Sequence, residues 1–258
     1  GVDVPEGATA VTFDHVSFFY ADDPDTMILQ DLDFRLEPGT VLGLLGRTGS
    51  GKSTLTKLLF RFYDPTDGAI LLGSGENRFD LRDARQAELR RHIGLVTQEV
   101  QLFHASVRDN LTLFDASISD GQILAVLDDL ELTPWLNSLP NGLDSPLQAD
   151  ASLSAGEAQL LAFVRVFLAD PGLVIMDEAS SRLDPVTEMK IEQAIDKLLA
   201  NRTGIIVAHR LATVQRADEI MILGNGRIVE YGRRTQLAAD PTSQFAQLLV
   251  TGLEEAIS

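Results

Sequence analysis

Residues 41–53, VLGLLGRTGSGKS, decide how this chain folds. Their first part, Val41–Leu45, is short and wholly apolar, which is typical of a strand buried in a parallel sheet. The glycine-rich part that follows cannot continue a strand. After it, between Ser53 and Tyr63, leucines and a phenylalanine recur at helical spacing, and the turn-forming residues 64–68 stop the pattern. The stretch therefore predicts a strand, a loop and an amphipathic helix in direct succession.

The loop in this stretch fits the Walker A pattern, in which backbone N–H groups and a helix N-terminus surround a phosphate. Lys52 is expected to reach the β- and γ-phosphates of a nucleotide, and Ser53 is expected to ligate Mg²⁺. A glycine-rich turn with an incidental lysine is the structural alternative, and the strand–loop–helix context favours phosphate binding. The predicted nucleotide-binding residues here are Gly46, Arg47, Thr48, Gly49, Ser50, Gly51, Lys52, Ser53 and Thr54.

A second apolar run, Leu173–Met176, ends in the two carboxylates of Asp177 and Glu178. Ligands of open α/β sheets bind at the carboxyl ends of the strands, so this run fits the Walker B pattern. Asp177 is suited to hold Mg²⁺ through water, and Glu178 is suited to orient and deprotonate the water that attacks the γ-phosphate. Ordinary acidic residues at a helix N-terminus are the alternative, and a preceding buried strand argues against it.

Two other parts of the chain predict lobes added to this core. Alternation between Val11 and Leu36 indicates an antiparallel pair of strands around the turn-rich residues 21–25. Residues 99–150 have the pattern of several short helices and lack strong strand signals.

The C-terminal part continues the alternation of strands and helices. Residues 204–208 form another buried-strand candidate, after a helix that Asp184 can cap and Pro185 can begin. Residues 220–231 predict a hairpin around Gly224-Asn225-Gly226, and two short helices close the chain. The fold class is therefore α/β, with a parallel sheet covered by helices.

Composition excludes several classes of protein. With 38 acidic and 21 basic residues, the net charge of -17 opposes binding to the phosphate backbone of a nucleic acid. The absence of cysteine excludes disulfides and thiolate metal sites. No apolar run approaches the roughly 18 residues that span a bilayer. Because the first methionine is Met27, we expect Gly1 to mark a boundary within a longer protein.

Further motifs, in a fixed order along the chain, identify a family. Leu153–Glu157, LSAGE, resembles the signature LSGGQ of ABC proteins and lies directly upstream of the Walker B run. Gln98 resembles the family's Q-loop, residues 180–184 its D-loop and His209 its switch histidine. Tyr20 matches the aromatic residue that stacks on adenine. Singly these residues fit ordinary surface or core positions, but together they resemble the nucleotide-binding domain of an ABC transporter.

The resemblance covers nearly the whole chain and implies a reaction. Residues 58–68, LLFRFYDPTDG, further resemble exporters rather than importer ATPases. The implied activity is hydrolysis of ATP to ADP and phosphate, with Mg²⁺ as cofactor. The implied catalytic residues are Glu178, His209, Lys52 and Gln98. The implied Mg²⁺ ligands are Ser53, Gln98 and Asp177.

The resemblance also implies partners and a division of the chain. Residues 1–258 are expected to form one ABC domain, with residues 1–98 and 170–258 as the β lobe and P-loop core and about 99–169 as the helical subdomain. Two such domains pack head to tail, as a homodimer or a heterodimer, and transmembrane domains anchor them at the cytoplasmic face of the membrane. The residues implied to reach the partner's ATP are Leu153, Ser154, Ala155, Gly156 and Glu157, and those of the D-loop are Ser181 and Asp184.

The signature segment departs from the family pattern. Ser154 and Glu157 form a capping box in the sequence, which predicts a helix N-terminus at this segment. The resemblance implies that this N-terminus faces the partner's ATP, as its positive dipole end favours. Ala155 adds a methyl group and Glu157 adds negative charge, so we expect the ATP site that this segment completes on the partner domain to be weakened. A heterodimer with two unequal ATP sites would account for this departure. Two alternatives are a soluble ABC ATPase acting on DNA or ribosomes, and a regulatory module that hardly hydrolyses ATP.

Overall fold

The computed structural model describes residues 7–97, 100–147, 153–177, 184–208 and 211–251. The chain divides into two units. Unit 1 comprises residues 1–95, 171–178 and 201–258, and unit 2 comprises residues 96–170 and 179–200. Among the described residues, no helix is long and apolar enough to cross a membrane.

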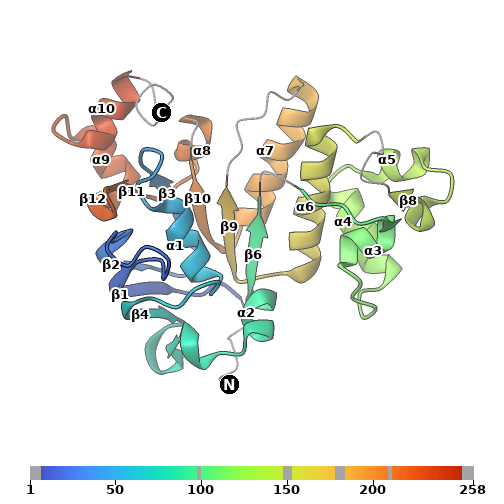
Figure 1. Cartoon of the computed structure of the whole chain (residues 1–258). Helices are drawn as coiled ribbons and strands as arrows, with labels where there is room; N and C mark the ends of the chain where they lie inside the picture. Colours follow the sequence, from blue (N-terminus) through green and yellow to red (C-terminus); the bar gives the residue numbers. More distant parts are fainter. Residues whose placement is uncertain (1–6, 98–99, 148–152, 178–183, 209–210, 252–258) are drawn as a thin grey trace. The chain divides into compact units, whose positions relative to one another are not determined.

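The central sheet is mostly parallel and has six strands (Figure 1). Its order is β12 (Arg227–Arg233), β11 (Glu219–Gly224), β3 (Val41–Leu45), β10 (Thr203–Val207), β9 (Leu173–Asp177) and β6 (Ile93–Val96). The predicted buried strands are confirmed, because every residue of β3 and β10 is buried. Val207 of β10 pairs with Leu44 on one side and with Asp177 on the other. The loop after β3 and the carboxylate that ends β9 therefore lie at the same edge of the sheet.

A second, antiparallel sheet belongs to the same unit. Its order is β2 (Leu29–Leu36), β1 (Val11–Phe18), β4 (Asp67–Leu72) and β5 (Phe79–Asp80). The predicted strand pair is confirmed: β1 pairs with β2, and alternate side chains of both strands are buried. The sequence prediction missed β4, which pairs with the other edge of β1.

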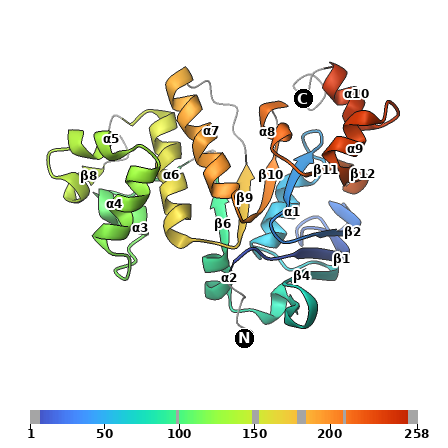
Figure 2. The same cartoon turned by 180° about the vertical axis from the view of Figure 1, so that it is seen from behind.

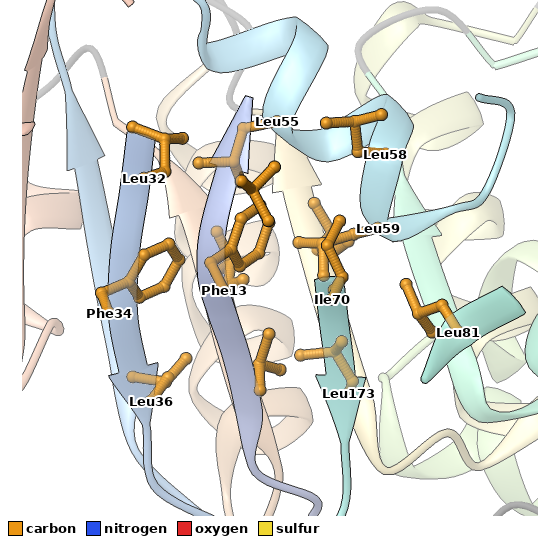
Figure 3. Close-up of a cluster of buried hydrophobic side chains, with 14 of the residues drawn as sticks. Phe13, Leu32, Phe34, Leu36, Leu55, Leu58, Leu59, Ile70, Leu81 and Leu173 are labelled. Atoms are coloured by element: carbon orange, nitrogen blue, oxygen red, sulfur yellow. The ribbon is translucent and has the colours of Figure 1, made fainter. Parts of the chain in front are cut away.

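Helix α1 (Lys52–Leu59) is anchored in the core of unit 1 by three leucines. Leu55, Leu58 and Leu59 are buried on one face of α1, in a cluster that includes Phe13 and Ile70 of the antiparallel sheet (Figure 3). Each such side chain contributes roughly 1.5–3 kcal/mol when it is fully buried. This packing fixes the start of α1, and with it the glycine-rich loop.

The predicted end of α1 was wrong. The helix ends at Leu59 instead of continuing to Tyr63, and Arg61 adopts a left-handed conformation with φ 51°. The guanidinium of Arg61 donates hydrogen bonds to the carbonyl oxygens of Leu81, at 3.0 Å, and Ala84, at 2.7 Å. Contacts with a later part of the chain, which local spacing does not report, accompany the turn at this point.

The remaining elements of unit 1 are small. They are α2 (Gln86–His92), α8 (Leu211–Gln215), α9 (Arg234–Ala239), α10 (Gln244–Thr251) and two 3₁₀ turns, η1 (Gly75–Asn77) and η2 (Leu81–Asp83). The predicted hairpin of β11 and β12 is confirmed, with Asn225 and Gly226 at φ 49° and 76° in its turn. The two closing helices are confirmed as α9 and α10.

Unit 2 is helical. Its elements are α3 (Val107–Thr112), α4 (Asp120–Asp129), α5 (Thr133–Ser138), α6 (Ala155–Ala169), α7 (Pro185–Leu199), the 3₁₀ turn η3 (Gly142–Asp144) and the two-residue strands β7 (Ala105–Ser106) and β8 (Pro146–Leu147). Helices α6 and α7 lie side by side in both views (Figures 1 and 2). Lys197 of α7 contacts the carboxylate of Asp129 at the end of α4, at 2.8 Å. The predicted cap of α7 is confirmed, because the Asp184 carboxylate accepts hydrogen bonds from the N–H groups of Val186 and Thr187.

Candidate nucleotide-binding site

The loop between β3 and α1 requires glycine at two positions. Gly46 has φ 147°, and a Cβ there would lie 2.4 Å from the Leu223 carbonyl oxygen and 2.6 Å from Ser50 Oγ. Gly51 has φ 108°, and a Cβ there would lie 2.6 Å from Leu29 Cδ2. Only glycine adopts these conformations without strain. The backbone of the loop is therefore held closely against β11 and β2.

Lys52 is a buried cation held by neutral groups. Its side chain is only 8% exposed, and Nζ donates hydrogen bonds to the carbonyl oxygens of Gly46 and, at 3.1 Å, Arg47. Burial lowers the pKa of Lys52, and the charge of Asp177 partly opposes this shift. In the described part of the chain no carboxylate lies within ion-pair distance of Lys52. A buried charge without a counter-ion is costly, so the site suits an anionic ligand.

Ser50 provides an independent observation at the same loop. Its Oγ is buried and has no hydrogen-bond partner among the described groups. Buried hydroxyl groups are normally bonded, so an unpartnered one next to a buried cation indicates a polar ligand. The loop conformation, Lys52 and Ser50 together fit the phosphates of a nucleotide.

Asp177 and Ser53 are the described candidates for holding Mg²⁺. Asp177 is exposed at the end of β9, and Ser53 is exposed in the first turn of α1. Since β9 and β3 are separated only by β10, and neighbouring strands lie about 4.8 Å apart, Asp177 is roughly 10 Å from Leu44, backbone to backbone. Hydroxyl and carboxylate oxygens are the ligands that Mg²⁺ prefers, so both residues fit the ion chemically.

Tyr20, the predicted adenine-stacking residue, lies just after β1 in an aromatic cluster. Its ring packs edge-on against Phe18, at 5.0 Å between centroids, and against Tyr63, at 5.2 Å. Its hydroxyl is 3.1 Å from Thr54 Oγ1, and Lys57 Nζ is 5.8 Å from the ring centroid. The structure thus connects Tyr20 to α1, the helix that follows the phosphate loop. The sequence analysis did not predict that Tyr63 and Phe18 pack around Tyr20. The aromatic-rich residues 60–63 were the available signal for Tyr63.

Four predicted residues lie outside the described part of the chain. They are Gln98, Glu178, Ser181 and His209. Asp184, from the predicted D-loop, is described and caps α7. Hydrogen bonds from Thr187 lower the pKa of Asp184.

The signature segment lies at the start of α6 in unit 2. The predicted capping box is confirmed: the Glu157 N–H donates to Ser154 Oγ at 3.2 Å, and the Ser154 N–H donates to Glu157 Oε2 at 2.8 Å. Ala155 is the first residue of α6, with an exposed side chain, and is not among the residues with positive φ. An alanine therefore fits this helical position without backbone strain. Leu153 is half-buried and Gly156 is buried.

The same capping box occurs a second time in this unit with a neutral partner. At the start of α4, the Ser119 N–H donates to Gln122 Oε1 at 2.9 Å, and the Gln122 N–H donates to Ser119 Oγ at 3.4 Å. The two boxes have the same hydrogen bonds. Glu157 therefore differs from a glutamine at this position chiefly in its charge.

Comparison with known proteins gives a consistent result. Residues 29–181 match the sequence profile of the family described as ABC transporter. The chain is 42% identical over 253 residues to the mycobactin import ATP-binding/permease protein IrtA of Mycolicibacterium smegmatis, which covers 98% of the chain and 29% of that protein. It is 40% identical over 233 residues to the ATP-dependent lipid A-core flippase of Pseudomonas aeruginosa, with coverage of 90% and 38% respectively.

A solved structure agrees with these relatives. The structure of a bacterial Atm1-family ABC exporter with ATP bound aligns with a TM-score of 0.84 and 32% identity, over 97% of this chain and 43% of that one. The chain therefore spans less than half the length of each of these three proteins. The predicted fold class, with its P-loop core, antiparallel lobe and helical part, is confirmed by this likeness.

Proposed function

The chain belongs to the ABC transporter family, and from this premise we propose that it hydrolyses ATP to drive a transporter of the exporter type. One observation carries the proposal: Lys52 is a buried cation whose bonds in the described part of the chain go to backbone carbonyls. It directly follows a glycine-dependent loop at the same sheet edge as Asp177. A triphosphate with its metal ion fits this arrangement of charges.

The chain's own residues are assigned as follows. Lys52 Nζ exchanges carbonyl partners for β- and γ-phosphate oxygens, and the N–H groups of the loop bind the same phosphates. Ser53 and Asp177, together with Gln98, would hold Mg²⁺, which when bound would offset the negative charge of the phosphates. Tyr20 presents its ring to adenine.

The hydrolysis step uses residues that remain predictions. Glu178 accepts a proton from water as the water oxygen bonds to the γ-phosphorus, and the bond between that phosphorus and the β–γ bridging oxygen breaks. His209 orients the γ-phosphate and the water. ADP and inorganic phosphate are the products.

An aromatic surface on unit 2 supports a membrane-domain partner. We define it as Phe103, Leu113 and Phe114, whose side chains are 44%, 55% and 58% exposed. The rings of Phe103 and Phe114 pack at 5.5 Å between centroids. Leu113 and Phe114 both have positive φ, which costs roughly 1–2 kcal/mol per residue. Exposed apolar groups held by a strained backbone are typical of a binding surface, and we assign this one to the transmembrane domains.

The names of the relatives bear on the rival functions. Several are ATP-binding/permease proteins, which combine both parts in one chain and favour a transporter over a soluble ATPase acting on DNA or ribosomes. One name specifies import and another a flippase, so similarity identifies the type of domain while export remains our proposal. The proposed location is the cytoplasmic face of the membrane, with a second nucleotide-binding domain as partner.

The experiment is a comparison of Glu178→Gln with the unmodified chain and with Glu88→Gln, a control on α2 outside the predicted site. Glu178→Gln should bind Mg·ATP normally and lose nearly all turnover, because only the proton acceptor is removed. Glu88→Gln should both bind and hydrolyse Mg·ATP like the unmodified chain. Undiminished turnover in Glu178→Gln would refute its role as the base, and failure of the unmodified chain to bind Mg·ATP would refute the proposed function.

A further inference from the structure

Unit 2 contains a half-buried arginine that the proposed reaction does not use. Arg165 lies on α6, the helix that begins at the signature segment, and burial lowers its pKa. No carboxylate in the described part of the chain forms an ion pair with it. Moving a guanidinium even partly out of water without an ion-pair partner costs free energy, so the hydrogen bonds that Arg165 makes instead are the feature to explain.

Within the described residues, the hydrogen bonds of the Arg165 side chain go to one residue, Asn110, on α3. Arg165 Nε donates to the Asn110 backbone carbonyl at 2.8 Å, and a terminal nitrogen of Arg165 lies 3.4 Å from Asn110 Oδ1. Since α3 ends at Thr112, the Asn110 carbonyl belongs to the last helical turn, where carbonyls lack partners within the helix. Arg165 thus caps the C-terminus of α3, where a positive charge is favourable.

Asn110 in turn holds one part of the aromatic surface, Phe103. Its side chain is fully buried, accepts from the Phe103 N–H at 2.8 Å and donates to the Phe103 carbonyl at 3.0 Å. It also donates to the Ser106 carbonyl at 3.0 Å. Immediately after α3 come the strained residues Leu113 and Phe114. The position of Phe103, against which the ring of Phe114 packs, therefore depends on Asn110, and Asn110 is bonded to α6 through Arg165.

We propose that Arg165 is a positioning residue that couples the aromatic surface to the signature end of α6. Displacement of Phe114 by a bound partner reaches Phe103 through the ring contact, and displacement of Phe103 moves Asn110 through its hydrogen bonds. The two contacts from Arg165 transmit that movement to α6. Because α6 is a rigid, packed helix, a shift at Arg165 also moves the helix N-terminus at Ser154. The assignment of the surface to a membrane domain rests on the proposed function, whereas the mechanical coupling within unit 2 does not.

The test is a double-mutant cycle read by amide hydrogen exchange on the chain without nucleotide. Phe114→Gly loosens the surface because it removes the ring contact with Phe103, while glycine keeps the left-handed backbone conformation without strain. We expect amides of residues 157–161 to exchange roughly tenfold faster in Phe114→Gly. In the Arg165→Met background the same change should add less than about twofold, because the connection is already absent. Residues 245–250 of α10 should not respond.

Arg108→Met is the matched control. Arg108 lies on α3 and forms ion pairs with Asp120 and Asp144, whereas Arg165 is bonded to Asn110. The full effect of Phe114→Gly should persist in that background. Arg165→Lys retains a cation that can reach the Asn110 carbonyl, and it should restore most of the coupling even if Arg165→Met folds poorly.

Equal acceleration in the native and Arg165→Met backgrounds would overturn the proposal, as would no acceleration in the native background. If the role of Arg165 is purely structural, Arg165→Met lowers the midpoint of urea unfolding, and the effects of Arg165→Met and Phe114→Gly on amide exchange simply add. Because no ATP is used, the outcome is independent of the Glu178→Gln assay, and the two proposals can fail separately.

Discussion

Replacing Lys52 by methionine tests the central electrostatic argument. Methionine has a similar length and no charge, and Lys52 is only 8% exposed, so an effective dielectric of about 20 applies rather than that of water. At about 4 Å, one unit charge and one phosphate charge then interact by about 4 kcal/mol. That corresponds to roughly a thousandfold loss of affinity for Mg·ATP.

The assay is a fluorescence titration with a labelled ATP analogue in the presence of Mg²⁺, with the fold checked by circular dichroism. Lys57→Met is the matched control, because Lys57 lies on the same helix with an exposed side chain. In a dielectric near that of water the same calculation gives at most about 1 kcal/mol, or roughly fivefold. A loss below about tenfold in a folded Lys52→Met protein would refute the assignment of Lys52 to the phosphates.

Three further outcomes are expected. First, affinity for Mg·ATP should fall as the pH rises through the pKa of Lys52, which is lowered below 10.5, because Lys52 in the protein without nucleotide then loses the proton that phosphate binding requires. Lys52→Met should not show this pH-dependent loss of affinity. Second, Tyr20→Phe should lose about 1 kcal/mol of unfolding free energy with its bond to Thr54 but keep ATP affinity, whereas Tyr20→Ala should bind ATP roughly tenfold more weakly; equal affinities would exclude stacking. Third, Ser154→Ala should lose about 1 kcal/mol of unfolding free energy in urea, because the helix loses its cap. Glu157→Gln should lose less than about 0.5 kcal/mol, because glutamine can form the same capping box. A larger loss in Glu157→Gln would show that the charge of Glu157 stabilises the helix.

The expected weakness of the signature segment remains a prediction. Ala155 fits its helical position, so the extra methyl group distorts nothing in this chain itself. The charge of Glu157 is the remaining difference from the family pattern. ATPase activity of the chain alone and mixed with a partner domain tests it: full activity alone would count against unequal sites.

The sequence by itself determined the features that depend on neighbours in the chain. The strand, loop and helix around Lys52, the capping box of Ser154 and the turn at Asn225 were all predicted, because apolar periodicity and capping chemistry act over a few residues. The family motifs also fixed the candidate site, since a phosphate loop needs its glycines and lysine in one short segment.

Tertiary structure decided what depends on distant segments. The turn at Arg61 is bonded to carbonyls about twenty residues later, and β4 gains its hydrogen bonds from β1, so local spacing placed the end of α1 wrongly and missed the strand. The bond from Arg165 to Asn110 joins residues 55 positions apart. Burial of Lys52 and the placement of Asp177 at the same sheet edge likewise arise only when strands pair, because charge and hydrogen-bond energies depend on distance in space rather than along the chain.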